Sequence, residues 1–338
     1  MLKLAKRIFI WITPGTIACY ALWLGLLHAN PGRDSLGLYR MMPTTCNAMI
    51  FGTSRSAQGV NPTILEQSGP KSRKWLNFSF NLGASPWNDA YVDAIQQKID
   101  CSIEPESQST FLVFVDPWVL DENTGRGEGS WLSANWSDFC EMAPFRYGLN
   151  KSNPLDVMSF GSGSDLLSVM CSSIPRQFIA FIKGNQSDYE NRGLQKNGWL
   201  PNPSEITREQ KIRAIRTKVK NYRNNKIIGD QWPANQNLSA LERFIEYLQK
   251  KLKDPTIFII RPPTSDEMRG LEDEWFPGAN QEFARLATSM NLSFIDTHHE
   301  WKQRDLMHFN DGHHMSIDGA NAFSSYIATE ILQNTLTD

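Results

Sequence analysis

The segment of this chain best suited to chemistry lies near its C-terminus, where histidines gather around one aspartate. Residues 309–320 read FNDGHHMSIDGA. An aspartate and a histidine three residues apart in a turn can place the carboxylate against one imidazole nitrogen, which leaves the other nitrogen free to act as a base. Only His314 stands three residues after Asp311, so this pair is the predicted acid and base. Metal binding by His308, Asp311 and His313 is the alternative interpretation of the same cluster.

A candidate nucleophile follows an apolar run near residue 50. Residues 50–56 read IFGTSRS, a buried strand that runs into Gly-Thr-Ser. This order places Ser54 at the carboxyl end of a strand, in a turn that Gly52 allows the backbone to make. A serine there can lie near a helix N-terminus, where backbone N–H groups stabilise developing negative charge. The alternative is a serine that only caps the next turn.

A glycine after a second apolar run is a candidate for the same site. Residues 77–85 read NFSFNLGAS and lead from a predicted strand into a helix. Gly83 can bring its N–H close to a bound carbonyl oxygen. On its own, the glycine is equally consistent with a position required only by the turn.

A parallel sheet is the element that must position these residues. Five short runs, rich in branched or aromatic residues, predict buried strands. They are Ala48–Phe51, Trp75–Phe80, Thr110–Val115, Thr256–Ile260 and Leu292–Ile295. Amphipathic helical patterns separate and follow them, and Ser85 before Pro86 is a good helix start. We therefore expect an α/β chain with three α/β/α layers around a five-stranded parallel sheet. Ligands of such sheets bind at the carboxyl ends of the strands.

The stretch from about 117 to 235 does not keep this rhythm, and we interpret it as an inserted cap or lid. Within it, residues 206–226 carry eight Lys/Arg against one acid, Glu209, with apolar residues at helical spacing. The pattern predicts an amphipathic helix. Its basic face is either simply solvated or turned toward phospholipid headgroups or an anionic glycan.

The first thirty residues predict the compartment. Basic residues precede an uncharged apolar stretch from Ile8 to Leu27, and twenty helical residues span about 30 Å, the thickness of a bilayer core. We expect residues 1–29 to form a cytoplasmic N-terminus and a transmembrane helix, with residues 30–338 outside the cytoplasm. A cleaved signal peptide is the alternative.

Charge and cysteine usage bound the partners. The formal net charge of −2 predicts no nucleic-acid partner. Cys46, Cys101, Cys140 and Cys171 would face an oxidising compartment, where one or two disulfides are expected.

Taken in chain order, the three blocks resemble the SGNH/GDSL hydrolase superfamily. They are Gly-Thr-Ser-Arg-Ser, Asn-Leu-Gly, and Asp-x-x-His followed by Met-Ser-x-x-Gly-Ala. The resemblance is greatest to its membrane-anchored cell-envelope members, the DltD- and AlgJ-like proteins. It implies a flavodoxin-like sheet, Ser54 as nucleophile, Asp311 and His314 as acid and base, and an oxyanion hole formed by the N–H groups of Ser54 and Gly83.

Two departures accompany this resemblance. The usual Gly-Asp-Ser is Gly-Thr-Ser here. The third block, which in many members supplies an asparagine to the oxyanion hole, reads Val115-Asp116-Pro117-Trp118. An ionised Asp116 cannot donate a hydrogen bond.

The resemblance implies a membrane-anchored, extracytoplasmic serine esterase or O-acyltransferase that needs no metal or cofactor. We expect it to act on small acyl esters, acetyl above all, of a cell-envelope polysaccharide through an acyl-serine intermediate. A membrane-bound O-acyltransferase is the expected protein partner. The alternative is a glycan-binding or assembly protein that keeps the fold but has lost efficient catalysis.

Overall fold

The computed structural model describes residues 45–79, 87, 89–121, 195, 197–202, 206–224, 232–302 and 304–333. The predicted transmembrane segment, Gly83 and most of the predicted insertion lie outside these ranges. Within them, no helix combines the length and the apolar character that crossing a bilayer requires.

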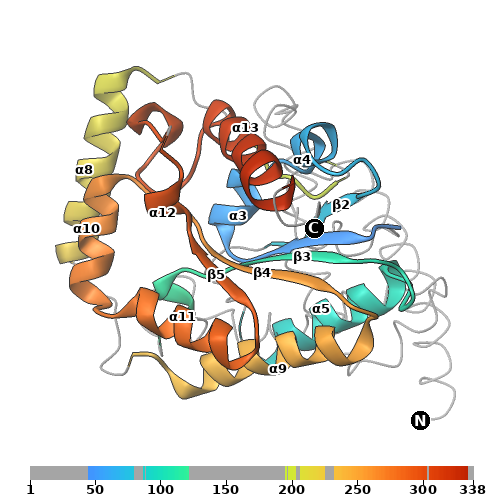
Figure 1. Cartoon of the computed structure of the whole chain (residues 1–338). Coiled ribbons are helices and arrows are strands. Elements are labelled where there is room, and N and C mark those ends of the chain that lie inside the picture. The colour runs from blue at the N-terminus through green and yellow to red at the C-terminus, as the bar shows by residue number, and fades with distance from the viewer. Residues whose placement is uncertain are drawn as a thin grey trace, which may run out of the picture.

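A five-stranded, wholly parallel sheet forms the centre of the chain, in the order β2-β1-β3-β4-β5 (Figure 1). The strands are β1 (Ala48–Phe51), β2 (Trp75–Asn77), β3 (Thr110–Phe114), β4 (Thr256–Arg261) and β5 (Ser293–Asp296). The predicted α/β class and the five-stranded parallel sheet are therefore confirmed.

The second strand is shorter than predicted because the side chain of Asn77 binds the neighbouring backbone. Its Nδ2 donates to the carbonyls of Ser56 and Val60, at 2.8 Å each, and its Oδ1 accepts from the N–H of Ser79 at 3.2 Å. These bonds tie the end of β2 to the helix that follows β1. The strand ends at Asn77, although the N–H of Phe78 still donates to the Ile50 carbonyl of β1 at 2.7 Å.

Helices cover both faces of the sheet and make three layers (Figure 1). On one face lie α5 (Asp89–Ser102), α9 (Asn235–Lys251) and α11 (Ala279–Ser289). On the other lie α3 (Ser54–Gly59), α4 (Pro62–Ser68) and α13 (Ile317–Tyr326), which continues as the π-helical η6 (Ile327–Leu332). Shorter or peripheral elements are η2 (Pro117–Leu120), α8 (Arg208–Asn224), α10 (Asp266–Trp275), α12 (Thr297–Glu300) and η5 (Leu306–His308).

The alternation of side chains along β1 divides the core in two. Met49 and Phe51 pack in the cluster that includes residues of α5, α9 and α11. Ala48 and Ile50 pack in the cluster that includes residues of α13. A strand whose side chains are buried on both faces explains why β1 is apolar throughout.

Residues Pro117–Leu120, at the start of the predicted insertion, pack in the folded core. Trp118, Val119 and Leu120 are buried in the same cluster as the α9 side, and the N–H of Ala234 donates to the carbonyl of Leu120 at 2.7 Å. The two ends of the predicted insertion are thus joined directly to each other.

Cys46 is buried and its thiol is free. Burial raises the pKa of this thiol to about 12. Its side chain packs into the apolar core, so Cys46 is not one of the cysteines that form the expected disulfides. Cys140, Cys171 and the side chain of Cys101 lie outside the described residues.

Gly52 stands where β1 ends, and its position excludes any larger residue. Its φ is +150°, and a Cβ there would lie 2.4 Å from Ser56 Oγ and 2.8 Å from Phe114 Cβ. The substitution Gly52→Ala combines steric overlap with an unfavourable backbone conformation. We expect it to lower the free energy of unfolding by about 2–3 kcal/mol, measured by urea denaturation. Gly270→Ala is the control, because nothing lies within 4 Å of a Cβ at that position. Equal stability of the two variants would contradict this reading of the turn.

Candidate active site

Ser54 lies at the carboxyl end of β1, as the first residue of α3. Thr53 caps the helix, and its Oγ1 accepts from the N–H of Arg55 at 3.3 Å. The first N–H groups of a helix have no acceptor within the helix. The N–H of Ser54, the first residue of α3, therefore has no acceptor within the helix.

The three residues predicted as nucleophile, base and acid meet in one hydrogen-bonded line. Ser54 Oγ lies 2.8 Å from His314 Nε2, and His314 Nδ1 lies 2.8 Å from Asp311 Oδ2. The sequence separates the serine from the histidine by 260 residues. The fold brings them together because α3 and the start of α13 pack on the same face of the sheet.

A tight turn holds Asp311 and His314 in register. An isolated antiparallel bridge joins Phe309 to Met315, and the N–H of Asn310 donates to the carbonyl of His314 at 2.8 Å. Gly312 occupies the left-handed region with a φ of +98°, which favours glycine. The turn places the Asp311 carboxylate against Nδ1 of the His314 ring.

The Asp311 carboxylate is held on both oxygens. Oδ1 accepts from the N–H of His314 at 3.0 Å and from the N–H of His313 at 3.4 Å. Oδ2 accepts from the His314 ring and from Lys218 Nζ, which lies 2.6 Å away. Burial opposes ionisation, but the hydrogen bond to His314 and the neighbouring positive charges hold the pKa of Asp311 well below its usual range. Asp311 is therefore a carboxylate at neutral pH.

The imidazole of His314 is favoured in its neutral form. Burial lowers its pKa most, Asp311 opposes that effect, and the charges of Lys218 and Arg55 add to it. A neutral ring whose Nδ1–H donates to Asp311 presents Nε2 as an acceptor to Ser54. The arrangement is that of a base ready to take the serine proton.

His313 and His308 occupy different environments from His314. His313 is buried, stacks on Tyr222 with ring centroids 6.1 Å apart, and meets the edge of His314 at 4.2 Å. Burial holds its pKa well below the usual value. His308 instead stacks on Trp301 at 5.0 Å, while its Nδ1 accepts from the N–H of Asp305 at 3.0 Å.

The group of potential metal ligands in the structure differs from the predicted one. Among the described residues, the potential ligand atoms that approach within 4.8 Å of one another belong to Asp311, His313 and His314, so His308 is not part of the group. Both ring nitrogens of His314 and Oδ2 of Asp311 already have hydrogen-bond partners. An ammonium group 2.6 Å from the carboxylate occupies the place a cation would take. The residues present fit proton transfer better than metal ligation.

A buried ionic network lies directly beneath the candidate site. Arg55 Nη2 contacts Glu272 Oε1 at 2.5 Å, Arg261 Nη2 contacts Glu272 Oε2 at 3.0 Å, and Trp118 Nε1 donates to Glu272 Oε1 at 2.9 Å. Burial opposes ionisation of Glu272, but the two arginines lower its pKa to about 2. The network therefore holds the side chain of Arg55, the residue after Ser54, in place.

Asp116, the acidic residue that follows β3, is part of this network. Its Oδ2 accepts from Thr53 Oγ1 at 2.9 Å and lies 3.8 Å from Arg55 Nε. Burial raises the pKa of Asp116, and Arg55 opposes the rise. Asp116 therefore holds Thr53, the N-cap residue of α3, in place one residue before Ser54.

Arg55, Glu272 and Lys218 are parts of the site that no sequence pattern predicted. Arg55 adjoins the nucleophile, which is a signal in itself. Glu272 and Lys218 lie on helices whose sequences resemble ordinary solvated faces, and only the fold brings them to the site. Gly83, the predicted second oxyanion donor, lies outside the described residues.

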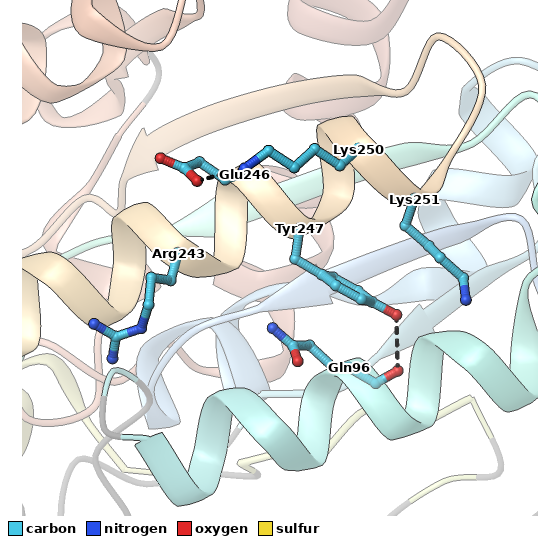
Figure 2. A pocket seen from close by; sticks show the side chains of 6 residues that line it. All are labelled: Gln96, Arg243, Glu246, Tyr247, Lys250 and Lys251. Carbon is cyan, nitrogen blue, oxygen red and sulfur yellow. Dashed lines mark hydrogen bonds and ion pairs between the residues drawn. The ribbon is translucent and has the colours of Figure 1, made fainter.

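A cavity of about 460 Å³ lies elsewhere, between α5 and α9 (Figure 2). Its charges are paired locally, Lys250 with Glu246 at 2.9 Å and Lys251 with Asp100 at 2.8 Å. Tyr247 Oη lies 2.7 Å from Asp100 Oδ1 and 3.3 Å from the carbonyl of Gln96, and Figure 2 draws the second of these contacts. It contains none of the residues that chemistry at Ser54 requires.

Comparison with known proteins does not assign this chain to a family. The chain matches no family model, and no curated protein or solved structure gives a significant match.

Proposed function

We propose that this chain is a serine esterase or O-acyltransferase that works through an acyl-serine intermediate. The observation that supports this proposal is the continuous line from Ser54 Oγ through His314 to Asp311, with both contacts at 2.8 Å. These distances lie in the range that general-base activation of a serine requires. The line ends at the carboxyl edge of a parallel sheet, where α/β proteins bind their ligands.

The reaction proceeds in two halves. His314 Nε2 takes the proton of Ser54 as Oγ attacks an ester carbonyl, and the tetrahedral intermediate collapses to an acyl-serine while His314 protonates the departing alcohol. An acceptor hydroxyl, of water or of a sugar, then gives its proton to His314 and attacks the acyl carbon. The bond between Ser54 Oγ and the acyl carbon breaks as His314 returns the proton to Oγ, which regenerates Ser54. Asp311 holds the ring and stabilises the imidazolium in each half.

Backbone groups stabilise the oxyanion in this proposal. The N–H of Ser54 is one donor, and the N–H of Gly83 is the second that the family resemblance implies. Asp116 faces Thr53 and Arg55, so it does not take the place of an amide donor. The loss of one oxyanion donor costs on the order of 10²–10³ in rate. We therefore expect modest turnover of simple esters.

The substrate assignment rests on the resemblance of the three sequence blocks to the SGNH/GDSL superfamily and its envelope branch. We propose acetyl or similar small acyl esters of a cell-envelope polysaccharide as substrate, with the predicted segment 8–27 as membrane anchor. A membrane-bound O-acyltransferase would supply or receive the acyl group. The acceptor that reaches the acyl-serine decides between hydrolysis and transfer.

A chromogenic acetate ester tests the proposal. The full chain should release chromophore with an initial burst close to one equivalent of enzyme, followed by slow turnover, because acyl-serine forms faster than it is resolved. Added polysaccharide hydroxyls should raise the steady-state rate if transfer is the reaction, and leave it unchanged if hydrolysis is. Release no faster than in buffer would contradict the proposal.

A non-catalytic glycan-binding or assembly protein is the second candidate. The acidic residue at the asparagine position favours it, because Asp116 Oδ2 accepts from the Thr53 N-cap of α3 and an ionised carboxylate cannot donate to an oxyanion. This candidate predicts that the full chain retains an acetylated polysaccharide in a pull-down but neither releases chromophore nor forms a covalent adduct. Chromophore release with a burst would exclude it.

A further inference from the structure

The inward face of α8 contacts the turn that carries Asp311 and His314. Lys211 Nζ donates to the carbonyl of Met307 at 2.5 Å, and the ring of Tyr222 stacks on His313. Between them, Lys218 Nζ binds Asp311 Oδ2 at 2.6 Å. These contacts come from positions i, i+7 and i+11 of one helix, which share a face. Lys211 and Lys218, two of the basic residues of the predicted helix, therefore bind it to the segment that carries the candidate site.

Lys218 and the ring of His314 share a single carboxylate oxygen. Asp311 Oδ2 accepts from both, while Oδ1 accepts from the backbone on the other side. The lysine thus fixes the orientation of the carboxylate from a direction that the turn itself does not supply. It also places a positive charge beside a ring that must become positive during the reaction.

The other titratable groups around His314 are either paired with an opposite charge or neutral. Arg55 is paired with Glu272 and lies near Asp116. His313 is buried with a pKa well below its usual value, and Tyr222 is neutral because burial raises its pKa to about 12. Lys218 is consequently the cation whose removal changes the field at His314 most directly.

We propose that Lys218 is a positioning residue that holds the Asp311 carboxylate against His314 and opposes the gain of positive charge on the imidazole. The inference rests on the proposed function for its kinetic consequence, but not for its effect on the ring. It also gives the insertion a role, since α8 supplies a contact that the sheet and the C-terminal turn lack.

The pH profile of the full chain tests the inference. In Lys218→Met, the acid limb of kcat/KM should move to higher pH, because an imidazolium beside Asp311 is no longer opposed by the ammonium. The ratio of kcat/KM at pH 5.5 to that at pH 8 should fall by roughly 3- to 10-fold. Lys218→Arg should restore the wild-type limb.

Lys220→Met is the matched control, because this exposed lysine removes the same charge from the same helix. Its profile should superimpose on the wild type. An equal shift in Lys220→Met, or no shift in Lys218→Met, would overturn the inference.

A second readout separates this inference from the proposed function. The ring resonances of His314, assigned from their loss in His314→Gln, can be titrated by NMR in the histidine-labelled chain without any turnover. The titration midpoint should rise in Lys218→Met and stay in place in Lys220→Met. Absence of ester turnover would count against the proposed function alone, whereas an unmoved midpoint would count against the role of Lys218.

Discussion

His314→Ala should lower kcat/KM for a chromogenic acetate ester on the order of 10⁴-fold or more while leaving the fold intact. The reason is that Ser54 Oγ has its hydrogen bond to His314 Nε2 and loses its base with the ring. A side chain at the edge of the core contributes little packing, so the melting temperature should change by only a few degrees. Initial rates and a thermal melt of the same preparation measure both quantities.

His299→Ala is the control for this substitution. His299 is largely exposed, and its nearest charged partner is Asp296, at 3.7 Å. Its rate should equal that of the unmodified chain. A His314→Ala variant that melts far lower yet still hydrolyses the ester would show that the ring is structural and that the base lies elsewhere.

The second large effect should come from Glu272→Ala, and it should be on stability. The carboxylate is fully buried and binds Arg55, Arg261 and Trp118. Removing it leaves two buried guanidinium groups without their principal counter-charge, which typically costs about 3–5 kcal/mol. Urea denaturation of the variant should show a loss of this size, or failure to fold at 37 °C.

The stabilising effect of the Glu272 carboxylate should also depend on pH, and stability should fall as the pH falls. Glu272 has a pKa lowered from an ordinary value of 4.5 to about 2, so its ionised form stabilises the folded chain. That contribution is fully present above pH 4.5 and is lost as the pH falls toward 2. In Glu272→Gln, which keeps an acceptor oxygen but no charge, the decline of stability in this window should be shallower. An unchanged slope together with an unchanged free energy of unfolding would show that the network contributes nothing to the fold.

Much of the sheet could be predicted because β1 to β4 are buried almost throughout, and only the edge strand β5 is partly exposed. Buried strands are largely apolar, and all five runs lie within a few residues of the observed strands. The predicted second run extends to Phe80, whereas β2 ends at Asn77, whose amide side chain binds backbone groups of a neighbouring element. Periodicity does not report bonds of that kind.

The candidate acid and base could be identified from spacing, because Asp311 and His314 lie in one turn and their contact is local. The ionic network could not, since Arg55 and Glu272 are 217 residues apart and each is ambiguous alone. The role of Lys218 could not be predicted either, because it lies in a helix rich in lysine and arginine. Which of its cations face inward depends on how α8 docks, and this is a property of the fold rather than of the local sequence.

Covalent labelling of Ser54 tests the central claim most directly. The full chain would be treated with a serine-reactive fluorophosphonate, digested and sequenced by mass spectrometry, alongside Ser54→Ala and, as a nearby hydroxyl control, Ser56→Ala. We expect one adduct, on Ser54, in the unmodified chain and in Ser56→Ala, and none in Ser54→Ala. A chain that remains unlabelled, or one that carries the adduct on another serine, would contradict the assignment of Ser54 as an activated nucleophile.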